Sequence, residues 1–361
     1  MKIINRYILK TFFVPFFYCI MSLELIYIVI DLFDNLSDFQ GAQVPFWEVL
    51  KFYGLLLPSS IIFIVPISLL LGVLYSLAQL TRHNELTAMR ASGISLYRLM
   101  YPFLFVGIVA SITVGIVNET LAPNSKYRTD QIVELHRKHG NEEVFIEKNL
   151  PYMNVKEKRV WMVERFDTRT YEMHGVKLAQ RRPDNSDAIK IEAGRAMWKD
   201  GHWWFYDVVL QNYKANGHPD GPPEVYEFRE MPNFNEQPGL FLDEIKGHDY
   251  FSVSEIGRFI KTHNLEPSFI TRLNVDKQYR LAAPWTCLIV TMIGIPFGSH
   301  TGRKGALAGI SLILLLFFAY YALIYACLGL GKSGYIHPLL AGWTPHIIFF
   351  LTAILMTAKM R

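Results

Sequence analysis

Three groups of residues have types and spacings that could support chemistry. The stretch GLGKSG at residues 329–334 matches a dinucleotide-binding glycine motif and the end of a phosphate-binding P-loop. His136 and His139 have a spacing that could place two metal ligands on one helix face. Glu24 and His346 are titratable residues inside long apolar stretches, where such groups are often functional. What each group can do depends on the elements that position it.

Six long apolar stretches dominate those elements. Each is near or above the roughly 20 residues that a helix needs to cross a hydrocarbon core about 30 Å thick. They run over residues 11–33, 52–80, 99–121, 281–299, 305–328 and 338–358. A long polar insert separates the third from the fourth. The expected fold class is therefore an α-helical membrane protein with six transmembrane helices, three on each side of the insert.

The insert alternates apolar and polar residues over short segments, as half-buried strands do. The segments are 158–164, 175–179, 188–193, 202–210 and 224–228. Turn residues such as Pro183-Asp184-Asn185 separate them. The spacing predicts an all-β jelly roll or sandwich. Its apolar interior could hold acyl chains or its edges could pair with another sheet; alternatively, the interior is an ordinary core.

The predicted organisation has four parts. They are transmembrane helices 1–3 over residues 1–122, with a cytoplasmic helix within 81–95; a periplasmic β domain over 123–250; connecting helices over 251–277; and transmembrane helices 4–6 over 278–361. Ser252 and Glu255 form a capping-box sequence, which predicts the start of one connecting helix.

Charge asymmetry predicts the orientation in the membrane. One set of short segments holds ten basic residues and a single acid, Glu85; the bases are Lys2, Arg6, Lys10, Arg82, Arg90, Arg98, Arg303, Lys304, Lys359 and Arg361. The opposite set holds Asp31, Asp34, Asp38 and Glu48 against Lys51 and Lys332. Both termini are therefore expected in the cytoplasm, and the insert in the periplasm outside a bacterial inner membrane.

Composition narrows the function classes. The 36 basic and 32 acidic residues give a net charge of +4, without a basic tail, so nucleic acid is not an expected partner. Cys19, Cys287 and Cys327 all fall in apolar stretches, which predicts buried thiols and no disulfide framework. The first apolar stretch is too long for a signal peptide and is expected to stay as a helix.

The three groups of candidate residues find little support once they are placed among the predicted spans. A P-loop requires glycine where the chain has Ala326, and apolar spans flank GLGKSG, so we expect a flexible loop there and no nucleotide. His136 and His139 lack a third ligand at a recognisable spacing, so no metal or other cofactor is expected. Glu24 and His346 are either proton sites or hydrogen-bonded partners of neighbouring helices.

The most specific segment is Arg82–Ser95, between the second and third spans. Glu85–Ala91 is expected to form a short helix that Gly93 ends. A short helix at the cytoplasmic face has the shape that ABC permeases use to dock their ATPase subunits.

The residues themselves resemble the LptF/LptG permease family of lipopolysaccharide export. The resemblance rests on Asn5–Lys10, Asn84–Gly93, Tyr279–Pro284, Ile295–Gly298, Arg303 and Gly305. The layout of three spans, an insert and three spans covers the whole chain. The LptG-type subunit looks slightly closer, because of the opening segment and Asp34-Asn35-Leu36.

The resemblance implies a half-transporter without catalytic residues of its own. A related six-span subunit would pair with it, and a cytoplasmic ABC ATPase dimer would supply the energy. Lipopolysaccharide would pass from the inner membrane, through the jelly roll, to a periplasmic bridge of similar folds and its membrane anchor. Carried over by position, the ATPase contacts would be Glu85, Leu86, Met89, Arg90 and Gly93.

The chain departs from the family at the outer end of the first span. Lysines can stand there in the family, whereas this chain has Asp31, Asp34 and Asp38. Lipid phosphates would then meet other bases, for which the candidates are Lys51, Arg272, Lys277 and Arg280, or a partner subunit. Alternatively, the lipid carries a different charge pattern, or divalent cations bridge it.

Two other functions fit the layout. A gradient-driven transporter could use Glu24 or His346 as a proton site, although no convincing inverted repeat is visible. A membrane-anchored periplasmic enzyme could act on lipid, although the insert shows no arrangement of nucleophile and base.

Overall fold

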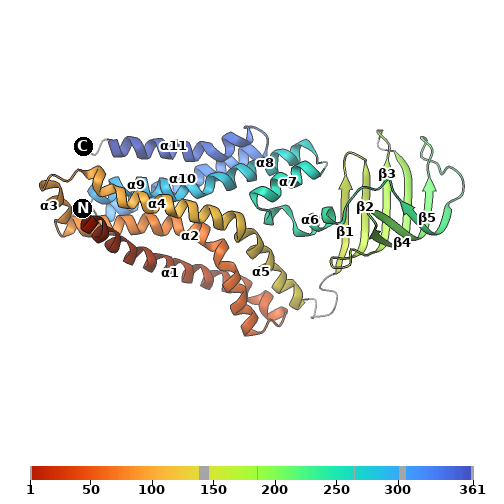
Figure 1. Ribbon diagram of the computed structural model, residues 1–361, viewed down its shortest axis with the longest axis horizontal. Helices are drawn as coiled ribbons and strands as arrows, with labels where there is room; N and C mark the ends of the chain where they lie inside the picture. The colour runs from red at the N-terminus through yellow and green to blue at the C-terminus, as the bar shows by residue number, and fades with distance from the viewer. Residues whose placement is uncertain (1, 138–145, 185, 264, 301–305, 359–361) are drawn as a thin grey trace. The chain divides into compact units, whose positions relative to one another are not determined.

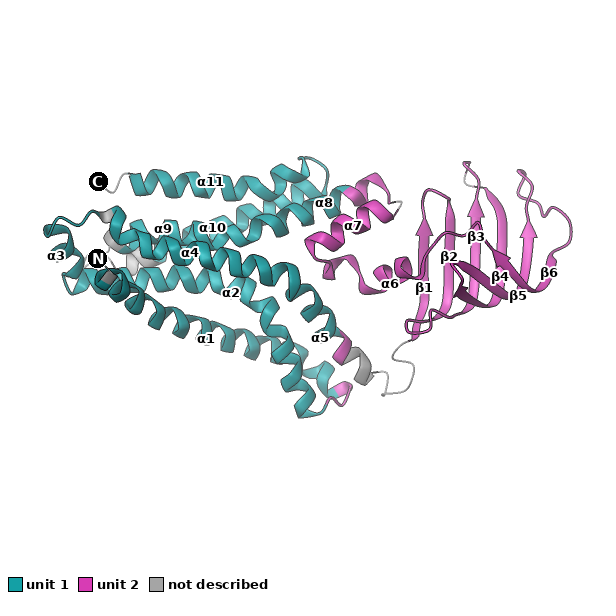
Figure 2. Ribbon diagram, in the orientation of Figure 1, with its two compact units in different colours: residues 1–40, 45–130, 271–361 teal, residues 41–44, 131–270 magenta. Residues whose placement is uncertain are grey.

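The computed structural model describes residues 2–137, 146–184, 186–263, 265–300 and 306–358. The chain divides into two compact units (Figure 2). The helical unit comprises residues 1–40, 45–130 and 271–361, and the sheet unit comprises residues 41–44 and 131–270. The longer part of the sheet unit begins inside α5 (Ala122–Arg137), a helix that follows α4.

The helical unit contains the membrane-spanning helices. Six helices among the described residues are long and apolar enough to cross a membrane, which confirms the six expected spans. Five are α1 (Lys2–Gly41), α2 (Phe46–Arg82), α4 (Leu96–Thr120), α10 (Ala306–Lys332) and α11 (Pro338–Ala358). The other joins α8 (Pro267–Ala282) to α9 (Thr286–His300) through the 3-10 turn Ala283–Trp285 (Figure 1).

Close helix contacts at glycines hold the core of the helical unit together. α2 packs against α9, and α4 packs against both. A Cβ atom at Gly298 would lie 2.8 Å from the Leu77 Cβ, and one at Gly107 would lie 3.0 Å from Thr291 Oγ1. Small residues let membrane helices approach in this way, where van der Waals contact is the main attraction.

α1 is the exception to this dense packing. Only 11% of its most apolar window is buried within the chain, against 56% for α2. Large apolar side chains, among them Phe17, Met21 and Leu25, are therefore exposed along it.

The GLGKSG stretch is helical up to Lys332 rather than the loop expected from its glycines. Gly331 lies where a Cβ atom would be 2.5 Å from the Ala341 Cβ, so the glycine permits the close contact of α10 with α11. Gly334, at φ +80°, ends the helix, and the Tyr335 N–H donates to Leu330 O. These glycines therefore serve packing and capping.

The sheet unit confirms a β insert between the two sets of spans. The strands are β1 (Ile146–Asn154), β2 (Arg159–Asp167), β3 (Met173–Arg181), β4 (Asp187–Lys199), β5 (His202–Asn212) and β6 (Glu224–Met231). They form one antiparallel sheet in the order β1 to β6 (Figure 1). The described strands thus join a single sheet rather than two packed sheets.

A helix covers the apolar face of this sheet. α6 (Pro238–Lys246) places the fully buried Phe241 ring against Tyr152, Trp161, Phe166 and Trp203, at centroid distances of 4.7–6.0 Å. Rings at these separations and angles attract one another beyond their hydrophobic burial. One helix and the loop before it therefore take the place of an opposing sheet.

α7 (Val253–Thr262) follows α6 and begins where the capping-box sequence predicts. The Glu255 N–H donates to Ser252 Oγ, and the Ser252 N–H donates to Glu255 Oε2. At the other end of α7, the buried His263 ring lies 3.9 Å from the Phe259 ring and 6.1 Å from the Tyr152 ring.

The buried His263 should make the sheet unit sensitive to mild acid. Burial lowers the pKa of His263 in the folded chain, against smaller opposite effects of the Leu240 backbone and the Asp243 carboxylate. A group with a depressed folded pKa stabilises the fold above its unfolded pKa, about 6.5, and this stabilisation is lost as the pH falls below it. We expect the melting temperature to fall between pH 7.5 and 5.5, and to fall less in His263→Gln.

Tryptophan fluorescence of the full chain in lipid nanodiscs measures this difference, because Trp161, Trp198, Trp203 and Trp204 lie in the sheet unit. His218→Gln is the matched control, since His218 is exposed. Burial also raises the pKa of Asp243 and Glu244, whose stabilisation is lost as the pH rises through their raised pKa values. An equal pH response of His263→Gln and the parent chain would contradict the assignment to His263.

Candidate functional site

The segment between α2 and α4 folds into a short, well-defined helix. Asn84 takes the left-handed conformation, φ +59°, after α2 ends, and turns the chain into α3 (Glu85–Ala91). Gly93 is also left-handed, φ +84°, and the Ile94 N–H donates to Met89 O at 3.2 Å. Both turns need residue types that tolerate positive φ, which is why an asparagine and a glycine flank the helix.

The five residues expected at a docking surface divide between two sides of α3. Leu86 is buried in the core of the helical unit, and Met89 is partly buried against that core. Arg90 and Gly93 are exposed, and Glu85 is partly exposed. Leu86 and Met89 therefore hold α3 in place, while Glu85, Arg90 and Gly93 are accessible to another molecule.

Glu85 is positioned by a residue from the start of the chain. The Tyr7 hydroxyl donates to Glu85 Oε2 at 2.7 Å, which links α1 to α3. Sequence reasoning did not assign Tyr7 a role, although it lies within the Asn5–Lys10 segment that carried the resemblance. This arrangement offers a carboxylate, a guanidinium and two tight turns at one short helix, which is suited to recognising a protein surface.

Glu24 joins α1 to α2 inside the helical unit. The Ser60 hydroxyl donates to Glu24 Oε1 at 2.5 Å, and both residues are buried. Glu24 Oε2 has no hydrogen-bond partner among the described residues. About two turns further along α1, the Tyr53 hydroxyl donates to Asp31 Oδ2 at 3.2 Å. These contacts favour a role for Glu24 in holding α1 against α2.

His346 belongs to a hydrogen-bonded chain between α9, α10 and α11. Its Nδ1 lies 3.1 Å from Gly342 O, so Nδ1 carries the proton of a neutral ring, because a carbonyl oxygen only accepts. Its Nε2 lies 3.4 Å from Thr286 Oγ1, which lies 3.0 Å from the Tyr320 hydroxyl. The buried imidazole is thus bonded at both nitrogens, which favours helix packing over proton transport.

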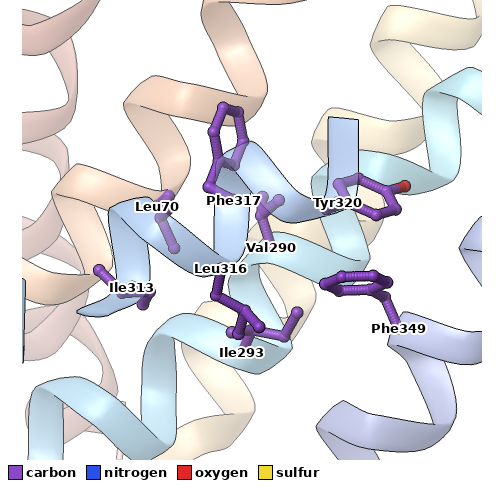
Figure 3. Close-up of a pocket in the computed structure, with 8 residues that line it drawn as sticks. All are labelled: Leu70, Val290, Ile293, Ile313, Leu316, Phe317, Tyr320 and Phe349. Atoms are coloured by element: carbon purple, nitrogen blue, oxygen red, sulfur yellow. The ribbon is translucent and has the colours of Figure 1, made fainter. Parts of the chain in front are cut away.

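A small pocket lies beside this chain of hydrogen bonds. Figure 3 shows side chains from α2, α9, α10 and α11 around it. The lining residues are Leu70, Val290, Ile293, Ile313, Leu316, Phe317, Tyr320 and Phe349. The lining is almost wholly hydrocarbon, and the one hydroxyl, of Tyr320, bonds Thr286.

The candidate phosphate-binding bases lie on two helices. Arg272, Lys277 and Arg280 are on α8, where Arg272 is exposed and the other two are partly buried. Lys51 is on α2 and lies 3.5 Å from the Glu48 carboxylate. Asp276, between Arg272 and Arg280, pairs with Lys332 of α10 at 2.7 Å. α8 therefore concentrates three of the four candidate bases.

The metal candidate does not gain support. His136 and His139 lie outside the residues whose side chains the structure describes. Among the described residues, no group of three or more histidine, cysteine, aspartate or glutamate side chains is arranged to hold a metal ion.

One buried charged pair was missed from the sequence. Arg159 Nη1 on β2 donates to Glu236 Oε2 at 3.1 Å, and both residues are almost fully buried, 3% and 1% exposed. Nothing in the local pattern pairs two residues 77 positions apart. The available signal was an arginine at the start of a strand whose other core positions are apolar.

Comparisons with known proteins show similarity over most of the chain. The family model described as "Lipopolysaccharide export system permease LptF/LptG" matches residues 6–359. The lipopolysaccharide export system permease protein LptF of Escherichia coli K12 is 20% identical over 318 residues, covering 87% of this chain and 83% of the relative. The protein of the same name from Shigella flexneri matches with the same identity and coverage.

Proposed function

Because the chain belongs to the LptF/LptG family of lipopolysaccharide export permeases, we propose that it forms one half of an ABC exporter that extracts lipopolysaccharide from the inner membrane. In this proposal a related six-span permease pairs with it, and a separate ATPase dimer supplies the energy. The single observation that carries the proposal is α3, a short helix fixed to the helical unit at Leu86 and exposed at Arg90.

The proposed orientation follows from α3 and from charge. The segments that hold Arg82, Arg90 and Arg98 are rich in bases, so α3 and both termini face the cytoplasm. The sheet unit then faces the periplasm. This places the ATPase contact and the lipid-receiving sheet on opposite sides of the membrane, as vectorial export requires.

The pairing with a second permease is supported by α1. Its apolar surface is the least covered by the rest of the chain, whereas α2 is packed on several sides. Either lipid or a second permease can cover such an apolar surface. A second permease adds close side-chain packing. We propose that α1 faces the partner subunit.

We propose that lipid phosphates meet the bases of α8. On α8, positive charge comes from Arg272, Lys277 and Arg280. The end of α1 carries acidic residues instead, namely Asp31, Asp34 and Asp38. Arginine is suited to phosphate because its guanidinium donates two parallel hydrogen bonds. Lys51 is the fourth candidate, although Glu48 lies beside it.

We propose that the sheet unit passes the lipid to a bridge of similar folds. β6 pairs with β5 on one side, and among the described residues no strand pairs with its other side. Val225 and Phe228 of β6 are exposed, 71% and 60%. An open strand edge with exposed apolar residues favours addition of a strand from another protein.

Co-purification tests the proposal. The tagged chain, extracted from inner membranes, should bring down a second six-span permease and a soluble ATPase. Arg90→Glu should lose most of the ATPase and keep the permease, because Arg90 is exposed on α3 while α1 is unchanged. A lone chain that transports lipid without an ATPase would contradict the proposal and favour a gradient-driven transporter.

A further inference from the structure

The apolar face of the sheet is closed by a segment that combines an acid with aromatic rings. We define the strap as residues 232–246, which run from the end of β6 through α6. Its Phe234 and Phe241 rings lie on the aromatic residues of the sheet, 5.8 Å and 5.4 Å from the Trp161 ring centroid. Its Glu236 is buried among hydrogen-bond donors of β1, β2 and β5.

Glu236 is bound as an anionic ligand would be. Arg159 Nη1 donates to Glu236 Oε2 at 3.1 Å, and Asn154 Nδ2 donates to Glu236 Oε1 at 2.8 Å. The Trp203 indole N–H donates to the Glu236 backbone carbonyl at 2.6 Å. The Arg159 guanidinium also lies 4.8 Å from the Phe234 ring centroid. The Glu236 carboxylate and the two phenylalanine rings of the strap thus occupy one site in the way that the head group and the tails of an acidic amphiphile would.

Two donors of this site lack an acceptor, although Arg159 Nη1 also donates to Asn233 O of the strap at 3.2 Å and Arg159 Nη2 lies 3.6 Å from Glu157 Oε2. Arg159 Nε and Trp161 Nε1 are buried and have no hydrogen-bond partner among the described residues. Arg159 and Trp161 are two residues apart on β2, so their side chains leave the same face of the strand. Buried donors without acceptors are uncommon in folded proteins and need an explanation. An anion with more oxygen atoms than a carboxylate would satisfy them.

The closed state is also held by a pair that is easily disturbed. The desolvation of a buried ion pair offsets much of its attraction, so such a pair stabilises the strap weakly while it is intact. Removing one partner leaves the other charge buried and uncompensated, which is strongly unfavourable. Burial raises the pKa of Tyr152, and the Glu236 and Glu244 carboxylates add to this effect while Arg159 opposes it.

We propose that Arg159, Asn154 and Trp161 form a binding site for the phosphate group of an anionic amphiphile, and that the strap occupies this site as an internal substitute until the ligand displaces it. The aromatic rings that now contact Phe234 and Phe241 would receive the acyl chains. This inference rests on the proposed function, because it assigns the sheet unit a lipid to receive. It makes the sheet unit a receiver that is closed when no lipid is present.

Hydrogen exchange of the full chain in nanodiscs of neutral lipid tests this site. The probe is a short-chain phosphatidic acid, and the comparison is the diacylglycerol with the same chains and no phosphate. In the parent chain, phosphatidic acid should increase exchange in residues 238–246, because the strap is displaced, whereas diacylglycerol should not. Unchanged exchange with both lipids would overturn the proposal. This measurement uses the parent chain, so it does not depend on whether a variant folds.

Two variants separate a ligand site from a structural pair. Glu236→Gln keeps the shape and removes the competing charge, so the concentration of phosphatidic acid that half-saturates the exchange change should fall about tenfold. Glu236→Gln with Arg159→Gln should lose this gain. Glu227→Gln on β6 is the control, since Glu227 is exposed. Increased exchange in Glu236→Gln without tighter phosphatidic acid binding would show that the pair is structural only.

These outcomes are independent of the ATPase. The lipid assay uses no nucleotide, so a chain that co-purifies with its expected partners and shows no displacement of the strap would refute the site alone. A chain without those partners that still binds phosphatidic acid at Arg159 would refute the exporter alone.

Discussion

Glu85→Ala is expected to separate ATP hydrolysis from lipid export. The variant should fold normally, because Glu85 is partly exposed and α3 remains anchored by Leu86. Export per ATP hydrolysed should fall about tenfold or more. Hydrolysis itself should continue, since the proposed ATPase is a separate chain.

The physical reason is that Glu85 has two roles in the proposal: it contacts the ATPase, and it links α3 to α1. Its carboxylate accepts from the Tyr7 hydroxyl at 2.7 Å, so a force on α3 reaches α1 through this bond. Tyr7→Phe removes the bond and keeps the carboxylate, which makes it the matched variant. Reconstituted vesicles that report ATP hydrolysis and lipid extraction together give the measurement.

Three results can be distinguished. A defect in both variants shows that the link between α1 and α3 matters, and a defect in Glu85→Ala alone shows that the carboxylate contacts the ATPase. If purified Glu85→Ala binds its ATPase and exports at the parent rate, the coupling role of α3 is wrong.

Gly342→Ala is expected to have the largest effect on stability. A Cβ atom at Gly342 would lie 2.8 Å from the carbonyl carbon of Gln278 and 3.0 Å from the Tyr279 amide nitrogen. These are backbone atoms of α8, so no side chain can rotate away and α11 must move. The displacement also strains the hydrogen bond from Trp343 Nε1 to Gln278 Oε1, now 3.1 Å long. Overpacking of this kind costs about 1–3 kcal/mol, and occasionally more.

Gly329→Ala provides the control in α10, the helix that packs against α11. A Cβ atom at Gly329 would meet no atom within 4 Å, and the residue lies in α10. Alanine there should be neutral or stabilise the helix by about 0.5–1 kcal/mol. Reversible unfolding in mixed micelles, or loss of monomer fluorescence on heating in nanodiscs, compares the two variants. Equal stability of Gly342→Ala and the parent chain would show that α8 and α11 separate easily.

Hydropathy located the membrane spans well because it reports which helical residues face hydrocarbon. It could not locate the helix ends, since polar residues continue a helix once it leaves the lipid. α1 runs to Gly41, beyond the apolar stretch that ends at residue 33. For the same reason α5 was not anticipated, because its polar sequence has no apolar stretch to mark it.

The strands were predictable where one face of the sheet is apolar and the other is polar. β2 to β6 alternate and lie close to the predicted segments. β1 was missed, because Asn149, with φ +55°, and Pro151 interrupt its alternation. The strap was missed for another reason: Phe234 and Phe241 contact residues more than 70 positions earlier, and local spacing carries no information about such contacts.

Helix α3 could be predicted as an element, but the sequence did not show which of its residues are accessible. Asn84 and Gly93 mark its ends in the sequence, and the structure has positive φ at both. Which side faces outward depends on the core of the helical unit, against which Leu86 and Met89 pack, and on α2, which contacts α3. Five residues were carried over from the family. Only their burial in the structure distinguishes those that anchor α3 from those that are accessible.

The strand order of the sheet has a consequence for how the chain is made. All five pairings join consecutive strands, so every ladder bond lies within residues 146–231. Contacts between neighbours in the sequence form fast, and domains fold as units during synthesis. The sheet can therefore assemble while the last three spans are still on the ribosome. The contacts of α2 with α9, more than 200 residues later, must wait, so the helical unit is completed after the sheet unit.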